Sequence, residues 1–211
     1  MCYAEDCPQA DTGPISSGNT INMPVEFPRN CYRVDAADVL VSVNARWLAF
    51  AQENGAPELT ETSVLGRFLW DFVSDDEMCK LYMEIHSRAR SSGVPIVLPF
   101  RCDSPSLQRH MRMTITHEHA GQLLYACLLV RAVPQRHTAV LDSGYPRADA
   151  HLTMCSCCKR ALLEPLGWLD VEEVSVRLGL FEAEKVPELR HTICPECAGT
   201  LKSAADNGNA A

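Results

Sequence analysis

The order of apolar and polar positions along residues 31–134 predicts short helices followed by an antiparallel sheet. A short β-rich run, Val39–Val43, precedes an amphipathic stretch that ends at the turn signal Asn54-Gly55. Three later segments alternate between apolar and polar residues or are wholly apolar, as strands are. These segments are Ile96–Cys102, Arg109–Ile115 and Leu123–Val130. The last one is apolar on both faces, so we expect it in the middle of a sheet, and the predicted fold class is α+β.

One longer helix is expected between the first strands and the last three. Its apolar residues recur every three or four positions, which is the spacing of one helical face. They are Met78, Leu81, Tyr82, Ile85 and Ala89. Ser74 is the predicted N-cap because Glu77 stands three residues later, and Gly93 is the predicted stop.

Two cysteine pairs near the C-terminus, Cys155-x-x-Cys158 and Cys194-x-x-Cys197, give the clearest chemical signal. A two-residue gap lets both sulfurs of a pair turn to one side of a tight loop, and two such loops complete a tetrahedron. Four thiolates leave no position for water or substrate, so the spacing predicts a structural zinc site. The insert 159–193 is longer than that of a simple four-cysteine ribbon and contains a predicted helix after Asp170.

Alternatives to this zinc quartet remain open at the level of sequence. Cys157, His151 and His191 are spare candidate ligands for the same metal. The cysteines could also be reduced and unligated, with the vicinal pair Cys157 and Cys158 acting as a redox element. A c-type haem is not expected, because Lys159 rather than histidine follows Cys158.

Composition and charge exclude several classes of function. The chain has 211 residues and a net charge of −8, and none of its segments is basic, so we expect no nucleic-acid partner. The eleven cysteines are an odd number, and the acidic start of the chain lacks the apolar core of an export signal. No apolar run is long enough for a membrane span, so we expect a reducing, cytoplasmic location. Cys2 and Cys7 receive no role.

The element order resembles that of a PAS domain: a strand pair, short helices, one longer helix and three antiparallel strands. The motifs Val43-Asn44 and Gly66-Arg67-x-Leu69-Trp70-Asp71-Phe72 carry this resemblance, together with the three-strand ending. The stretch from Cys155-Ser-Cys-Cys158-Lys-Arg through Trp168 to Cys194-Pro-Glu-Cys197 is similar to a small cysteine module that ends some bacterial PAS-containing signalling proteins. The resemblance implies a bacterial sensory or regulatory protein with a PAS-like domain and a zinc-stapled module.

These patterns divide the chain into five parts. They are an irregular tail (1–30), a PAS-like sensory domain (31–134), a linker (135–151), a four-cysteine zinc module (152–202) and a disordered tail (203–211).

The PAS resemblance implies a cavity between the sheet and the longer helix, where some members hold haem, flavin or a small metabolite. Arg109 shares a strand face with apolar residues, so it is either a ligand anchor or the partner of an internal acid such as Asp71 or Asp103. His86 borders the apolar helix face. Haem-binding members use a histidine on the corresponding helix, although a hydrogen-bonded surface histidine is the simpler interpretation.

The sequence contains no catalytic constellation, so we expect no enzyme activity. The first hypothesis is a module that senses a small ligand or binds a partner protein, acting through a homodimer or a separate signalling partner. The alternatives are a haem- or redox-responsive sensor using His86 or thiols, and a structural adaptor whose core is filled by side chains.

Overall fold

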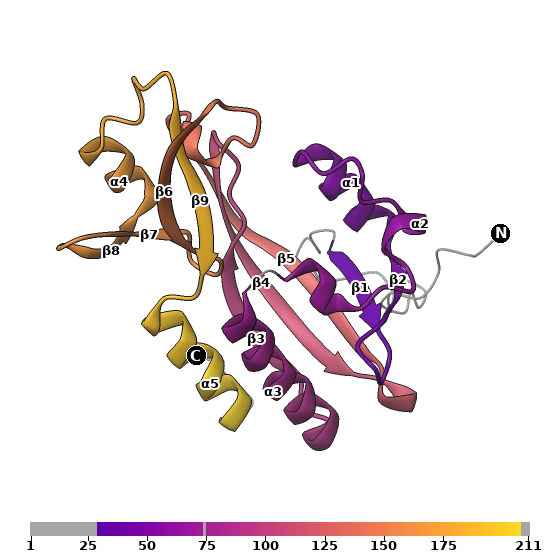
Figure 1. Ribbon diagram of the computed structural model, residues 1–211. Helices are drawn as coiled ribbons and strands as arrows, with labels where there is room; N and C mark the ends of the chain where they lie inside the picture. Colours follow the sequence, from indigo (N-terminus) through magenta and orange to yellow (C-terminus); the bar gives the residue numbers. More distant parts are fainter. Residues whose placement is uncertain (1–28, 74, 208–211) are drawn as a thin grey trace, which may run out of the picture.

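A five-stranded antiparallel sheet in the order β2-β1-β5-β4-β3 forms the larger of two units in the computed structural model, which describes residues 29–73 and 75–207 (Figure 1). Its strands are β1 (Asn30–Val34), β2 (Leu40–Val43), β3 (Ile96–Arg101), β4 (Leu107–His117) and β5 (Leu123–Pro134). β5 lies between β1 and β4, the central position that its apolar run predicted. The short helix η2 (His119–Gly121) turns β4 into β5.

Four helical segments connect β2 to β3. They are α1 (Ala45–Glu53), α2 (Glu61–Val64), η1 (Leu69–Phe72) and α3 (Asp76–Ser92). α3 buries most of the predicted apolar face against the sheet, and Gly93 ends it in the left-handed conformation with φ 66°. The cap that the structure describes is Asp75, whose side chain accepts a 2.7 Å hydrogen bond from the Met78 amide. The predicted cap, Ser74, lies outside the described residues.

This element order and sheet order confirm the predicted fold class. The larger unit is α+β, with a PAS-like antiparallel sheet flanked by helices, and a smaller C-terminal unit follows it.

The smaller unit contains a second, four-stranded sheet in the order β8-β7-β6-β9. Its elements are η3 (Ala139–Leu141), β6 (Arg147–Cys155), β7 (Arg160–Leu163), β8 (Gly167–Asp170), α4 (Val171–Arg177), β9 (Val186–Thr192) and α5 (Pro195–Asn207). β9 runs parallel to β6, which places the two cysteine pairs at the same end of the sheet. α4 is the helix predicted after Asp170.

Three boundaries differ from those expected from the sequence. β1 begins at Asn30, the last residue of the expected tail 1–30, because Asn30 pairs with Cys127 of β5. β6 begins at Arg147, inside the expected linker 135–151, because it pairs with β9 from Val186 onwards. α5 continues to Asn207, inside the expected tail 203–211, because Ala204 is fully buried. α5 lies beside α3 (Figure 1), and its residues Ala198, Leu201 and Ala204 belong to the same apolar core as α3. The two units therefore share a core instead of being separated by a flexible connection.

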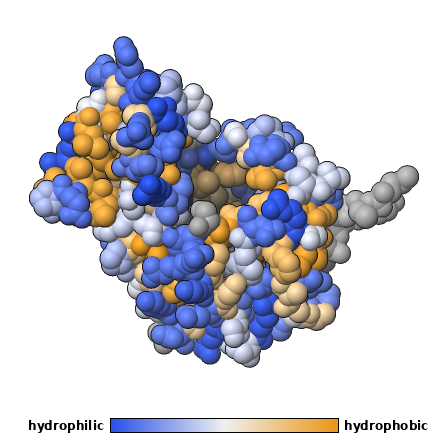
Figure 2. Space-filling view, in the orientation of Figure 1, coloured by the Kyte–Doolittle hydropathy of each residue, from blue (hydrophilic) through white to orange (hydrophobic). Residues whose placement is uncertain are grey.

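The outer surface of the smaller unit is apolar in one region. Figure 2 shows apolar side chains gathered around α4 and the β7–β8 hairpin, where Leu166, Val176 and Leu178 are exposed. Among the described residues, no helix combines the length and the apolar character needed to cross a bilayer.

Candidate metal centre and adjoining pocket

Four cysteine side chains meet where the two units join. The sulfurs of Cys155, Cys158, Cys194 and Cys197 all lie within 4.8 Å of one another, and those of Cys158 and Cys194 are 3.8 Å apart. Cys155 is the last residue of β6, and the turn from Cys155 to Cys158, here called the knuckle, closes with Lys159 at φ 61°. In the part of the chain that the structure describes, this is the one cluster of metal-ligating side chains, and it is positioned to hold a metal ion.

Backbone amides support the negative charge that such a cluster needs. The Cys194 amide donates to the sulfur of Cys155 at 3.4 Å, and the Cys197 amide donates to the sulfur of Cys194 at 3.5 Å. The pKa of Cys155 is lowered, because the thiols of Cys157, Cys158 and Cys197 donate hydrogen bonds to its sulfur. The pKa values of Cys158 and Cys197 are raised, because their thiols share hydrogen bonds with the charged sulfur of Cys155, so a bound metal ion would have to displace these protons.

The three spare ligand candidates lie outside this cluster. His151 is exposed on β6 and lies 3.8 Å from the carboxylate of Glu188. His191 lines a different pocket, where burial and the nearby charge of Lys159 lower its pKa. Cys157 is buried, and its pKa is raised to about 12 by the sulfur of Cys155 and by burial. A thiol with so high a pKa is protonated at neutral pH, which disfavours a redox role for Cys157.

Beside the knuckle lies a pocket of about 260 Å³, here called the aromatic pocket. It is lined by residues from β1, η1, α3, β3, β4 and the knuckle: Tyr32, Leu69, Trp70, Phe72, Val73, Asp75, Met78, Tyr82, Phe100, Met113, Ser156 and Cys157. Most of its walls belong to the larger unit and lie between the sheet and α3, where the PAS resemblance implies a cavity. Its last wall is supplied by the smaller unit.

The knuckle is fixed to the sheet next to this pocket. The Arg101 amide at the end of β3 donates a 2.7 Å hydrogen bond to the carbonyl oxygen of Cys157. The side chain of Cys157 packs into the shared apolar core. The metal cluster and the aromatic pocket are therefore parts of one structure, with Cys157 belonging to the wall between them.

His86 is buried, not a surface residue, and both of its ring nitrogens already have partners. Nδ1 lies 2.7 Å from a carboxylate oxygen of Asp38, so this nitrogen carries the proton and donates it. Nε2 is hydrogen bonded to the hydroxyl of Tyr125. Because neither nitrogen is free to bind iron, the geometry does not support His86 as a haem ligand.

Arg109 is buried on the predicted strand face, but its side chain is used internally. Its Nε donates a 2.5 Å hydrogen bond to the Cys102 carbonyl, and its guanidinium lies 5.0 Å from the ring centre of Phe50. The side chains of the expected acid partners pair with other arginines: Asp71 lies 3.3 Å from Arg67, and Asp103 lies 2.5 Å from Arg101. Asp103 also accepts a 3.0 Å hydrogen bond from the backbone amide of Arg109. Arg109 does not line the aromatic pocket.

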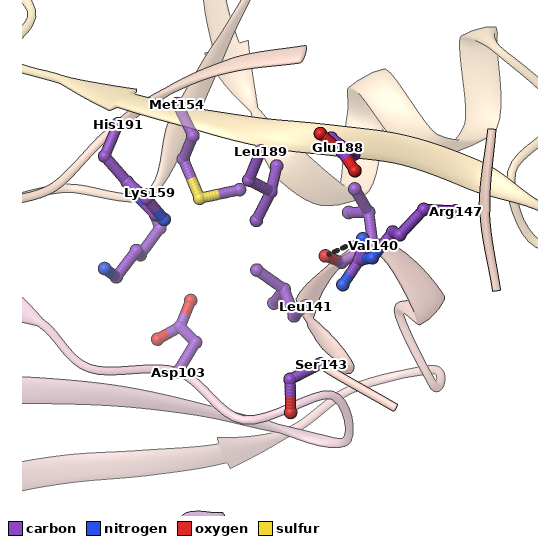
Figure 3. A pocket seen from close by; sticks show the side chains of 10 residues that line it. All are labelled: Asp103, Val140, Leu141, Ser143, Arg147, Met154, Lys159, Glu188, Leu189 and His191. Atoms are coloured by element: carbon purple, nitrogen blue, oxygen red, sulfur yellow. Dashed lines mark hydrogen bonds between the residues drawn. The ribbon is translucent and has the colours of Figure 1, made fainter. Parts of the chain in front are cut away.

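A larger pocket of about 480 Å³ lies between the β3–β4 connection and the β6–β9 face of the smaller unit (Figure 3). Its two basic side chains, Arg147 and Lys159, are already hydrogen bonded to backbone carbonyls. Arg147 donates to the carbonyl oxygens of Val140, Asp142 and Pro187, and Lys159 donates to the carbonyl of Ser156 at 3.1 Å. Because these basic side chains bind the protein's own carbonyls, we interpret this pocket as a polar contact region between the two units.

Sequence reasoning did not identify the tyrosines of the aromatic pocket. Tyr32 is on the edge of the expected tail, and Tyr82 was assigned only to the apolar face of a helix. A tyrosine on an apolar face, where leucine or phenylalanine would also fit, is the sequence pattern that could have indicated this pocket, because a buried hydroxyl needs a hydrogen-bond partner.

Comparison with solved structures shows that the chain is similar to PAS domains. No protein-family model matches the chain, and its sequence matches no curated protein. Among solved structures, the chain is similar to the PAS domain from Bordetella pertussis BvgS, with 15% identity and a TM-score of 0.33, covering 49% of this chain and 73% of that one. It is also similar to a sensory box sensor histidine kinase from Vibrio cholerae, with 9% identity and a TM-score of 0.35, covering 52% of this chain and 84% of that one. The strand order described above establishes the PAS-like fold of the larger unit independently of these superpositions.

Proposed function

We propose that this protein is a sensory or regulatory protein without catalytic activity, which binds a small ligand in the aromatic pocket and a structural zinc ion at its four cysteines. The observation that carries the proposal is the shared knuckle: Cys155 and Cys158 belong to the cysteine cluster, and Ser156 and Cys157 line the pocket. A ligand in this position contacts the segment that the metal holds.

The sulfur geometry fits zinc. Zinc binds thiolate sulfur at about 2.3 Å, so the sulfurs of a tetrahedral site lie roughly 3.8 Å apart. The Cys158–Cys194 separation of 3.8 Å agrees with this value, and the other pairs lie within the 4.8 Å limit. Four thiolates also favour a soft, tetrahedral ion over magnesium or calcium. When bound, the ion would join β6 to α5 and supply folding energy to the region between them.

The output of such a protein leaves through contact with another protein, in this proposal a second copy of the chain or a separate signalling partner. The described residues contain no group of side chains arranged as a nucleophile with its base, and the sequence has no phosphate-binding loop. The buried, doubly hydrogen-bonded His86 argues against haem as the sensed group.

Elemental analysis of the purified chain, combined with an ultraviolet–visible spectrum of the same sample, tests the proposal. We expect one zinc per chain and no visible absorption band. Iron with a Soret band would overturn the choice of metal and ligand together, and a chain that folds without metal would overturn the structural role of the cysteines.

A further inference from the structure

We propose that the metal-held knuckle is the closing wall of a binding site for an uncharged, flat aromatic molecule that carries a hydrogen-bond acceptor, so that ligand and metal each strengthen the binding of the other. This inference rests on the proposed function and adds to it the class of ligand and its coupling to the metal.

The hydroxyl groups of two tyrosines in the pocket lack strong partners. The Tyr32 hydroxyl has no hydrogen-bond partner among the residues that the structure describes. The Tyr82 hydroxyl has only the thioether sulfur of Met113, 3.9 Å away, and a thioether is a weak acceptor. Both side chains are partly buried among apolar groups of the pocket, so the protein itself offers their hydroxyls no strong acceptor. A carbonyl or ether oxygen on a bound molecule would accept from them.

Burial keeps these hydroxyls protonated and therefore able to donate. Desolvation raises the pKa of Tyr32 and of Tyr82 well above the ordinary value of a phenol. The described lining contains one ionisable carboxyl group, Asp75, and its side chain already accepts from the Met78 amide as the helix cap. None of the described residues that line the pocket carries a positive charge. The pocket therefore favours a neutral ligand over an anion or a cation.

The rest of the lining favours an aromatic ring. Trp70, Phe72 and Phe100 supply aromatic surface, and Met78 and Met113 supply adaptable thioether contacts. The pocket volume of about 260 Å³ is sufficient for a ligand of two fused rings with room for contacts. Tyr32 itself stacks on Tyr125 with ring centres 4.5 Å apart, which holds its ring in position before a ligand arrives.

Coupling to the metal follows from the position of the knuckle. Ser156 and Cys157 line the pocket and stand between the two cysteines of the first pair, so a metal bound to Cys155 and Cys158 would restrain the turn that carries them. Hydrogen bonds from the Arg101 amide to Cys157 and from the Ser156 amide to Thr192 hold the same turn, so we expect loss of the metal to loosen this wall of the pocket. By thermodynamic linkage, whatever factor the metal adds to ligand affinity, the ligand adds to metal affinity.

The probe for the experiment is 1-indanone, a neutral bicyclic ketone, and its matched control is indane, which lacks the carbonyl. Affinities of the full chain for both are measured by chemical-shift titration, with zinc bound and after chelation. We expect 1-indanone to bind the zinc-loaded chain more tightly than indane does. Tyr32→Phe and Tyr82→Phe should each weaken 1-indanone by about fivefold and leave indane unchanged, since each removes one hydrogen bond of about 1 kcal/mol.

Two further measurements separate coupling from simple unfolding of the zinc-free chain. Cys157→Phe fills the knuckle end of the aromatic pocket, so this variant should retain one zinc but lose 1-indanone binding. Lys159→Gly is the control, because Lys159 lines the larger pocket instead, and this variant should keep its affinity for 1-indanone. With the wild-type chain, saturating 1-indanone should raise the apparent zinc affinity, measured against a competing chelator, by the same factor by which zinc raises 1-indanone affinity.

Equal 1-indanone affinity with and without zinc would overturn the coupling and leave the ligand class and the proposed function intact. Equal affinities for 1-indanone and indane, or no binding of either, would overturn the ligand class. A chain that binds 1-indanone but holds no zinc would contradict the metal part of the proposed function itself.

Discussion

The guanidinium of Arg101, at the end of β3, lies 3.0 Å from the carboxylate of Glu172 in α4 and so joins the two units of the molecule. The same guanidinium is 2.5 Å from Asp103, whose side chain is fully buried. The Arg101 backbone amide also holds the knuckle through Cys157. One residue therefore links the PAS-like sheet, the smaller unit and the knuckle.

Arg101→Ala should destabilise the chain by about 2–3 kcal/mol, because it leaves the buried carboxylate of Asp103 with only the Arg109 amide as a donor. The loss is measured as a lower urea midpoint. Arg177→Ala is the matched control, since Arg177 makes an exposed pair with Glu173 one helical turn away and should cost about 0.5 kcal/mol or less. A similar loss in both variants would contradict the linking role of Arg101.

Cys194→Ser should abolish stoichiometric zinc binding and lower the thermal midpoint, because the serine hydroxyl is a poor replacement for a thiolate ligand. Loosening should be greatest in α5 and the knuckle, which hydrogen exchange can locate. The second apolar core, around Val171 and Val174, contains no cysteine and should stay protected longer. Cys157→Ala is the control and should keep one zinc per chain. Full zinc content in the Cys194→Ser variant would remove Cys194 from the ligand set.

The larger fold was predictable because local pattern and tertiary structure agree there. The helix face of Met78 to Ala89 and the wholly apolar run of β5 are buried as their periodicity indicates. The position of α5 was not predictable, since its polar composition masks the small residues, such as Ala204, that let it approach α3 closely. Spacing identified the four cysteines, but the role of Cys157 depends on the fold bringing β3 beside the knuckle, and no local pattern encodes that contact.

Tyr125→Phe should destabilise the chain by about 1–3 kcal/mol, although it removes only one oxygen atom. The substitution leaves Nε2 of the buried His86 without a partner, and an unsatisfied buried polar group carries this cost. Tyr145→Phe is a suitable control, because its hydroxyl bonds one carbonyl, that of Ala183, in a half-buried position. Urea unfolding of both variants under the same conditions makes the comparison. Equal losses in the two variants would show that His86 finds another donor.

The Asp38 carboxylate should make stability depend on pH in the acid range. Burial alone would raise the pKa of Asp38, but hydrogen bonds from His86 and Arg90 outweigh it, so the pKa is lowered from its ordinary value of 3.8. As pH falls, the unfolded chain takes up this proton before the folded chain does, so the contribution of Asp38 is present above about pH 4 and is lost as pH falls through the folded pKa.

Asp38→Asn removes the titration and keeps a residue type that tolerates the left-handed backbone at this position. The difference in unfolding free energy between wild type and Asp38→Asn, measured by urea titration from pH 6 to pH 3, should therefore shrink towards the acid end. A difference that stays constant across this range would mean that the groups facing Asp38, namely His86 and Arg90, do not hold its carboxylate in the charged form.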